Sequence, residues 1–338
     1  MTPSRFDRRS PIRRQGLVLA LATLASLLLA GAALASNGGL APQPPKSPGA
    51  GRIDHIYWLL IAISGAIFVL VEGALILFVI RFRSRGRSRL LEGPQIHGAT
   101  RLELIWTGIP VVILAAIVAF VLVELPGIKN VPAAGAGTKQ LTVKVEGRQF
   151  YWNFIYPNGV VQVGRMPVPA DRVVRLEITS PDVDHSWWIP SLDGQFDAIP
   201  GQTNHTWFKV HAGTYLGQCG EFCGYQHPTM KAAVVAIPGP QFDRWLKSEA
   251  SAQQNGTSKL GQETYQGVCA TCHGFRGEGG VGKTLAGNPI TAQAAAIRTL
   301  LQNGRGKMPA VGRGWGDRQL NALIVYLRRF APGGSGGH

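Results

Sequence analysis

Residues 219–230 read Cys-Gly-Glu-Phe-Cys-Gly-Tyr-Gln-His-Pro-Thr-Met, a short stretch with several side chains of the kinds that bind metals. It brings two thiols, an imidazole and a thioether (Cys219, Cys223, His227 and Met230) into one short segment. Thiolate, imidazole and thioether ligands form a soft set, which selects copper over hard cations. Zinc is the alternative, although Met is a poor ligand for it. The segment therefore predicts a copper-binding loop.

A second imidazole must come from outside this loop. The other histidines nearby in the sequence are His185, His205 and His211. We choose His185 because it follows a strand-like run and the pair Asp182-Val183, and precedes Ser-Trp-Trp-Ile-Pro. His205 and His211 fit ordinary strand or turn positions.

The chain around the copper loop has the pattern of β-strands. From Thr138 onward, short alternating or β-branched runs are separated by Pro, Gly and Asn, which is typical of strands joined by turns. The runs are Leu141–Val145, Val173–Thr179, Thr206–Val210 and Ala232–Ile237. We expect an antiparallel β-sandwich or barrel that carries the copper loop.

Two apolar stretches precede these strands, at residues 56–80 and 104–126. Each is long enough to cross a bilayer, which takes about 20 helical residues. The segment between them, residues 81–103, is rich in Arg, and short basic loops stay in the cytoplasm. The pattern predicts a transmembrane hairpin with everything after residue 126 outside the cell.

The N-terminus predicts a signal peptide over residues 1–35. Several Arg residues precede an apolar run, Leu17–Leu34, that ends in Ala33-Leu34-Ala35. An uncleaved first membrane helix is the alternative, because the run is long for a signal core. Residues 36–55 then form a spacer that is rich in Gly and Pro up to residue 51.

A second cofactor motif lies in the C-terminal part of the chain. Cys269-Ala-Thr-Cys272-His273 is the pattern of covalent c-type haem attachment, with His273 as the proximal iron ligand. A zinc site would need another Cys/His pair, and the sequence offers only His338 after His273. Met308 is the only Met in this part, so we expect it to be the sixth iron ligand; such His/Met ligation raises the reduction potential.

The segments around this motif complete the domain plan. We expect residues 239–258 to form a linker with a helical part at 241–254. Residues 259–332 should form an all-α cytochrome c domain, and residues 333–338 should form a tail. The last helix, residues 317–330, places one apolar set on a single face: Leu320, Leu323, Ile324 and Leu327.

Two other interpretations of these motifs are disfavoured. The four cysteines could form disulfides, but each pair lies inside a fuller ligand pattern. Gly277–Thr284 formally fits the phosphate-loop pattern, which requires a preceding buried strand; here it follows the haem-binding His273. We do not expect nucleotide binding.

Four segments resemble cytochrome c oxidase subunit II. They are Asp182-Val183-Asp184-His185-Ser186-Trp187, Asp197-Ala198-Ile199-Pro200-Gly201, the copper loop, and Glu103-Leu104-Ile105-Trp106-Thr107 with Pro110. The resemblance spans residues 53–238 and implies a cupredoxin-like β-sandwich at 138–238 with a dinuclear CuA centre. Residues 259–330 resemble small class I cytochromes c.

The resemblance implies a ligand set. Two copper ions would be bridged by the thiolates of Cys219 and Cys223, and the shell would be completed by His185, His227, Met230 and the backbone carbonyl of Glu221. The Glu221 side chain would face a magnesium ion at the junction with subunit I; a solvated loop acid is the alternative.

Two carboxylates fall within or beside the apolar stretches. Glu103 matches the family's residue at the mouth of a proton path into subunit I, and an interfacial acid is the alternative. Glu72 lies inside an apolar helix, where ionisable groups are functional candidates, but it has no family match.

One position departs from the family. Phe150, in Gln149-Phe150-Tyr151-Trp152, stands where the family usually has the Trp that receives electrons from a soluble cytochrome. A fused donor could explain the change. Trp152 remains as a family-like aromatic or a plain core residue.

The implied function is that of an electron-transfer subunit of a respiratory haem-copper oxidase. Electrons would pass from cytochrome c or another donor through haem c to CuA and on to subunit I, where oxygen is reduced to water with proton translocation. No catalytic residue lies in this chain, and subunit III is a further expected partner. We expect a multi-pass bacterial cell-membrane protein with both domains on the periplasmic side. The net charge of +15 does not indicate nucleic-acid binding, because its basic residues mostly flank apolar stretches or lie in the C-terminal domain.

Three alternatives belong to other functions. A nitric oxide reductase can use a similar copper subunit, and only the catalytic partner distinguishes it. A membrane-anchored copper-delivery protein is disfavoured by the nearby His227 and Met230 and by the two-helix anchor. A quinol oxidase subunit would lack the copper ligands.

Overall fold

The computed structural model describes residues 42–82, 98–132, 140–255 and 257–334. The predicted signal peptide lies outside these residues, as do parts of the predicted spacer, basic loop and tail.

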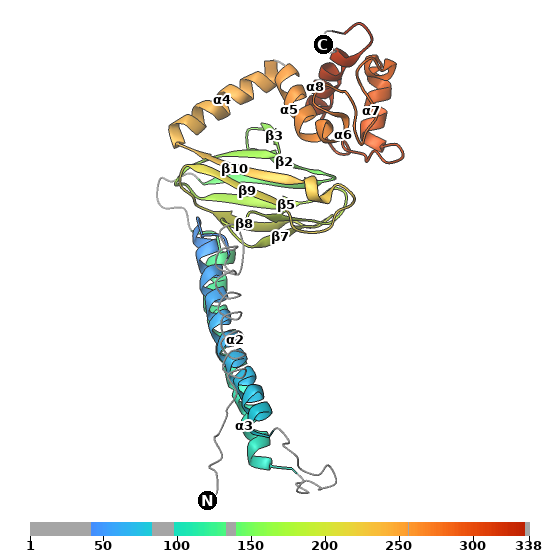
Figure 1. Ribbon diagram of the computed structural model, residues 1–338. Coiled ribbons are helices and arrows are strands. Elements are labelled where there is room, and N and C mark those ends of the chain that lie inside the picture. Colours follow the sequence, from blue (N-terminus) through green and yellow to red (C-terminus); the bar gives the residue numbers. More distant parts are fainter. Residues whose placement is uncertain (1–41, 83–97, 133–139, 256, 335–338) are drawn as a thin grey trace, which may run out of the picture. The chain divides into compact units, whose positions relative to one another are not determined.

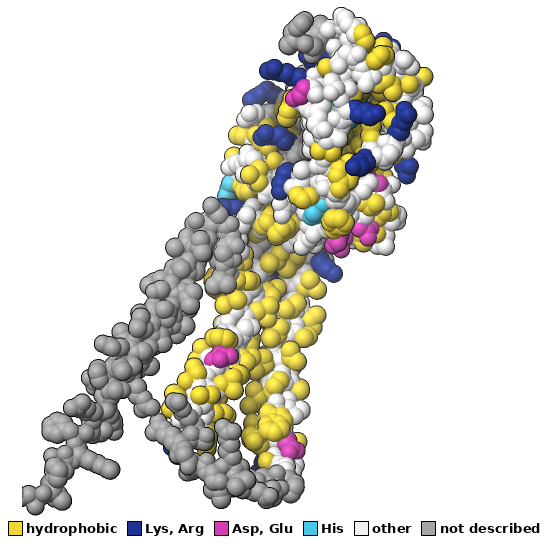
Figure 2. Space-filling view, turned by 45° about the vertical axis from the view of Figure 1, so that its right-hand side comes forward, with side chains coloured by type: hydrophobic (Ala, Val, Ile, Leu, Met, Phe, Trp, Pro, Cys, Tyr) yellow, Lys and Arg dark blue, Asp and Glu magenta, His cyan; other side chains and the backbone are white. Residues whose placement is uncertain are grey.

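Two long helices, α2 (Pro48–Arg81) and α3 (Thr100–Lys129), lie side by side (Figure 1). Both exceed the predicted apolar spans, and α2 begins well before residue 56. Apolar side chains cover them (Figure 2), and few of their residues are buried within the chain. A helix that is apolar on all sides must be covered by other apolar matter, and both helices are long enough to cross a membrane.

An ion pair joins the two helices where the membrane segment meets the domains that follow. Arg52 of α2 donates to Glu124 of α3 over 2.7 Å, and the Glu124 side chain is largely buried. An ideal Cβ on Gly127 would collide with the Arg52 guanidinium, so a side chain at this position would displace the guanidinium from its present place.

The chain after α3 begins with a sandwich of two five-stranded sheets. The first sheet has the order β3-β2-β1-β5-β8 and the second β4-β10-β9-β6-β7. The strands are β1 (Leu141–Arg148), β2 (Tyr151–Ile155), β3 (Val161–Val163), β4 (Arg165–Pro169), β5 (Val174–Thr179), β6 (His185–Trp188), β7 (Gln195–Ala198), β8 (Asn204–Phe208), β9 (Gly213–Cys219) and β10 (Lys231–Ile237).

The prediction of a purely antiparallel sandwich was wrong for two pairs. Strand β1 pairs with β5 in parallel, and β4 pairs with β10 in parallel, whereas the other pairs are antiparallel. Alternation of apolar and polar residues shows that a strand exists and which face is buried, but it is the same for either direction of pairing.

The sandwich core lies between the two sheets. Strand β5 shows the alternation directly, because Val174, Leu176 and Ile178 are fully buried while the residues between them are partly exposed. The core runs on into the copper loop, since Cys219, Cys223 and Met230 belong to the same apolar cluster. The loop therefore rests on a packed layer and is not a free surface segment.

The predicted linker is largely helical. Helix α4 (Gly239–Asn255) packs Phe242 and Trp245 against the sandwich core. Near its end, the Gln253 side chain accepts from the backbone N–H of Val161 (3.1 Å) and donates to the carbonyl of the same residue (2.8 Å). This amide caps the edge strand β3 much as another strand would, so α4 is fixed to the sandwich.

The C-terminal domain consists of short helices around its own core. They are α5 (Thr257–Thr264), η3 (Tyr265–Cys269), α6 (Ala270–His273), η4 (Pro289–Ala292), α7 (Ala294–Asn303), α8 (Asp317–Leu327) and η5 (Arg328–Phe330). The predicted apolar face of α8 is confirmed, because Leu320, Leu323, Ile324 and Leu327 are all buried.

Candidate metal centre and haem site

The copper loop connects two neighbouring strands, with its ends held together by backbone pairing. It leaves β9 at Cys219, passes through the single turn η2 (His227–Thr229) and enters β10 after Met230. The N–H of Cys219 donates to the carbonyl of Met230 over 2.9 Å. Because β9 and β10 are antiparallel neighbours, the first and last donor residues of the loop face each other.

The sulfur and nitrogen donors of the loop converge on one small volume. The two thiol sulfurs are 4.0 Å apart, and Cys223 Sγ lies 3.6 Å from His227 Nδ1 and 3.9 Å from Met230 Sδ. Cys219 Sγ lies 3.2 Å from the carbonyl oxygen of Glu221. Each of these donor atoms thus lies within 4.0 Å of another donor atom.

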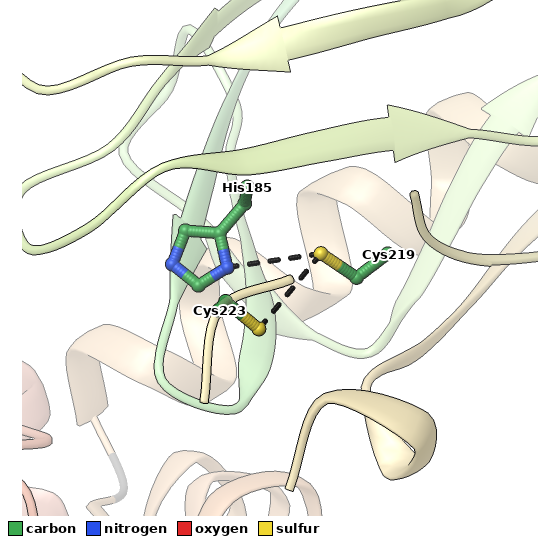
Figure 3. Close-up of side chains that lie close together, drawn as sticks. All are labelled: His185, Cys219 and Cys223. Atoms are coloured by element: carbon green, nitrogen blue, oxygen red, sulfur yellow. Dashed lines mark hydrogen bonds between the residues drawn. The ribbon is translucent and has the colours of Figure 1, made fainter. Parts of the chain in front are cut away.

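His185 comes from a different strand and completes the cluster. It stands at the start of β6, which pairs with β9, and its side chain is fully buried. Its Nδ1 points to Cys219 Sγ at 3.8 Å, and Figure 3 shows Cys223 next to both residues. Among the described residues, His185, Cys219 and Cys223 form a group whose donor atoms all lie within 4.8 Å of one another.

Asp182 holds the His185 ring in this orientation. Its Oδ1 lies 2.9 Å from His185 Nε2, so the neutral ring donates from Nε2 and keeps Nδ1 free for a metal. The backbone N–H groups of Gln149 (2.8 Å) and Val183 (2.7 Å) also donate to the Asp182 carboxylate. Burial favours the neutral acid, but these hydrogen bonds outweigh it and lower the pKa of Asp182.

One of the two thiols is poised to lose its proton, because the contact between them lowers the pKa of Cys219, whereas the same contact and burial raise the pKa of Cys223. The contact with His185 adds to the lowering of the pKa of Cys219. Metals bind thiolates, so a preformed thiolate favours loading. The donor set and its burial fit a copper pair.

The remaining histidines of the sandwich lie apart from this cluster. His211 is almost fully exposed and pairs with Asp171 over 2.6 Å, while His205 lies on β8 of the other sheet. Of these three histidines, His185 is the one whose ring lies beside the two thiols.

The haem motif occupies one turn of the C-terminal domain. Cys269 is buried at the end of η3, and Cys272 and His273 lie in α6. His273 Nδ1 lies 2.7 Å from the carbonyl oxygen of Lys283, so the ring donates from Nδ1 and leaves Nε2 for iron. An ideal Cβ on Gly282 would lie 2.7 Å from the same ring, so this glycine gives the close approach.

The segment that mimics a phosphate loop therefore has another role. Residues 277–284 wrap around His273, and the N–H of Gly282 donates to the carbonyl of Cys272 over 2.8 Å. Neither a strand before it nor a helix opening from it is present in this described segment.

Met308 lies in a turn that packs on the same core. Its N–H and carbonyl pair with Arg305, and its half-buried side chain contacts the apolar cluster that includes Cys269 and Leu301. The described structure thus places the three residues of the haem motif in one turn and Met308 against the same core.

The membrane carboxylates have simpler surroundings. Glu103 Oε1 accepts from the N–H of Ala99 over 3.0 Å, at the start of α3. This contact gives a partner to a backbone N–H group at the start of the helix, which has none within the helix itself. Glu72 is exposed on α2 among apolar residues. Both residues therefore face whatever surrounds the helices.

Several functional residues escaped the sequence analysis. Asp182 was quoted only as part of a motif, although an acid three residues before a buried His could have suggested its role. Arg148, Tyr225 and Gln226 make contacts to the C-terminal domain that no local pattern predicts.

Comparison with known proteins agrees with this geometry. Residues 35–123 match the family model described as cytochrome c oxidase subunit II, transmembrane domain, and residues 160–237 match the periplasmic domain of the same subunit. Residues 256–327 match the model described as cytochrome c oxidase, cbb3-type, subunit III.

Relatives cover most of the chain. Cytochrome c oxidase subunit 2 of Alkalihalophilus pseudofirmus is 28% identical over 84% of this chain and 89% of its own length. A probable cytochrome c oxidase subunit 2 of Rickettsia bellii is 34% identical over 64% of this chain and 87% of its own. The crystal structure of the periplasmic domain of subunit II from Bradyrhizobium japonicum is 32% identical, with a TM-score of 0.33, and is matched over 36% of this chain and 97% of that chain.

The fold and the resemblance expected from the sequence are thereby confirmed, with two membrane-spanning helices followed by extracytoplasmic domains. The chain belongs to the cytochrome c oxidase subunit II family of haem-copper oxidases, and it carries a cytochrome c domain fused to its C-terminus.

Proposed function

We propose that the copper loop and His185 hold the dinuclear CuA centre of the oxidase. Cys219 and Cys223 would bridge the metals, and His185, His227, Met230 and the carbonyl of Glu221 would complete the shell. The convergence of these six donors within 4.0 Å of a neighbour carries this proposal. A thiolate-bridged copper pair supplies one-electron transfer, and the buried, hydrogen-bonded surroundings keep its ligands in place.

In the same proposal, Cys269, Cys272, His273 and Met308 would hold haem c, the two cysteines through covalent bonds and His273 and Met308 through the iron. The Lys283 carbonyl fixes the His273 tautomer that leaves Nε2 for iron. Haem c supplies a second one-electron site. The chain would thus take electrons from an external donor into its C-terminal domain, conduct them to the sandwich and deliver them to subunit I.

Three finer assignments belong to this proposal. The side chain of Glu221 is exposed and could bind magnesium together with subunit I. Glu103 is exposed at the start of α3, which suits proton uptake into subunit I. Cytochrome c is the proposed donor and subunit III a further partner. The nitric oxide reductase and copper-delivery alternatives are disfavoured by the oxidase relatives over most of the chain.

Replacing one bridging thiol tests the copper assignment. Cys223→Ser should abolish the copper absorption and electron paramagnetic resonance signals, because Ser is a hard ligand that cannot bridge copper as a thiolate does. The haem c spectrum should stay intact. Unchanged copper content and signal in the variant would refute the assignment.

A further inference from the structure

Two neighbouring residues of the copper loop reach into the cytochrome c domain. The Tyr225 hydroxyl donates to the carbonyl of Lys307 over 3.0 Å, and Gln226 Nε2 donates to Cys272 Sγ over 3.5 Å. These contacts join residues that are about 80 and 50 positions apart in the chain.

The partners of these two residues flank the haem site on both sides. Lys307 directly precedes Met308, the proposed sixth iron ligand, and Cys272 directly precedes His273, the proposed proximal ligand. Gln226 itself directly precedes the copper-loop residue His227. One dipeptide of the copper loop therefore contacts both segments that carry the proposed iron ligands, namely helix α6 and the turn of Met308.

The Gln226 side chain is held in its orientation. It is buried, and Thr229 Oγ1 lies 2.8 Å from the backbone carbonyl oxygen of Gln226 and 3.1 Å from its Oε1, so the two oxygens share the one hydroxyl proton. With the oxygen engaged in this way, the amide NH₂ faces Cys272. The contact to the haem-attachment turn is therefore preorganised by the copper loop.

Tyr225 is supported by the residue that departs from the family pattern. Its ring meets Phe150 edge to face, with centroids 5.0 Å apart and an interplanar angle of 70°. An ideal Cβ on Gly224 would lie 3.0 Å from the Phe150 ring, so this glycine lets the aromatic pair approach the loop. Phe150 thus packs under the Tyr225 contact.

We propose that Tyr225 and Gln226 are positioning residues that hold both sides of the haem site of the cytochrome c domain against the copper loop. This inference rests on the proposed function. The pair fixes the closest approach between the two sites by contacts of this chain alone, before any external donor binds.

Separate contacts keep the cytochrome c domain attached when this pair is removed. Gln162 of β3 donates to Glu263 of α5 over 3.1 Å, and Trp315 Nε1 donates to the Tyr151 hydroxyl over 2.8 Å. Arg148 also donates to the carbonyl of Arg313. Removing the positioning pair should therefore loosen the approach locally and leave the domain folded.

The test uses the assembled oxidase with Tyr225→Phe and with Tyr225→Phe/Gln226→Leu. Haem c is reduced by a light pulse, and its reoxidation by the copper site is followed optically. We expect Tyr225→Phe to slow this step about fivefold. Loss of one net hydrogen bond lowers the population of the closely held arrangement of the two domains by about that factor. The double variant should be slower still, by a smaller added factor, because sulfur is a weak acceptor.

Hydrogen–deuterium exchange gives a readout that does not depend on electron transfer. The amides of residues 303–311 should exchange about fivefold faster in Tyr225→Phe, because the Lys307 carbonyl loses its partner. Copper resonance and haem c absorption should match those of the unmodified protein.

Gln162→Leu is the matched control, because it also breaks one hydrogen bond between the sandwich and the cytochrome c domain, away from the copper loop. It should leave both readouts unchanged. Equal slowing in the control, or unchanged rate and exchange in Tyr225→Phe with both centres intact, would overturn the inference. A missing copper signal in the unmodified protein would overturn the proposed function instead.

Discussion

The hydrogen bonds of Asp182 allow a quantitative prediction for Asp182→Asn. The carboxylate accepts from His185 and Val183 at Oδ1 and from the Gln149 N–H at Oδ2. If the Asn oxygen keeps the first two bonds, its NH₂ group faces the Gln149 N–H, and two donors then oppose each other. Loss of one hydrogen bond to a charged acceptor costs about 1.5–3 kcal/mol.

The same change loosens the tautomer and orientation of His185. Substituting such a supporting partner of a metal-binding His typically lowers metal affinity about 10- to 100-fold. Titration of the metal-free protein with copper in competition with a chelator measures this affinity. Asp184→Asn is the matched control, since Asp184 is the exposed acid next in the same turn. Equal copper affinity in Asp182→Asn and the control would refute the role of Asp182.

Burial and the nearby Glu249 raise the pKa of Glu263 to about 7, so its ionisation opposes folding as the pH rises from about 4.5 to 7. In thermal unfolding, Glu263→Gln should therefore stabilise the protein more at pH 8 than at pH 5. Equal gains at the two pH values would contradict this. Tyr151→Phe removes the hydroxyl that pairs with Trp315 Nε1 and with the Val311 carbonyl. It should therefore lower the free energy of unfolding by about 2 kcal/mol in a denaturant titration. An unchanged free energy of unfolding would count against a stabilising role of these two hydrogen bonds. Met308→Ala should lower the haem c midpoint potential in a redox titration, and an unaltered midpoint would exclude Met308 as a ligand.

The parts of the fold that depend on local pattern could be predicted from the sequence. Apolar length indicated both membrane helices, and the period of Leu320, Leu323 and Leu327 indicated the buried face of α8. The parallel pairing of β1 with β5 could not be predicted, because strand direction leaves no mark on side-chain alternation. The helix of the linker could be predicted, but its attachment to the sandwich depends on Gln253 meeting an edge strand far away in the sequence.

The candidate site divides in the same way. The donors Cys219, Cys223, His227 and Met230 share one loop, so their spacing alone indicated a metal site. His185 could be selected because its neighbouring residues were distinctive. The contact of Gln226 with Cys272 arises only when two separately folded domains meet, and no spacing within either domain encodes it.

The central claim is that this loop holds a pair of copper ions in a chain that also carries haem c. Metal analysis combined with electron paramagnetic resonance of the purified, fully loaded protein tests it most directly. We expect two copper ions per haem c and one unpaired electron coupled to both copper nuclei. Zinc, a single isolated copper ion or no metal at this loop would contradict the account.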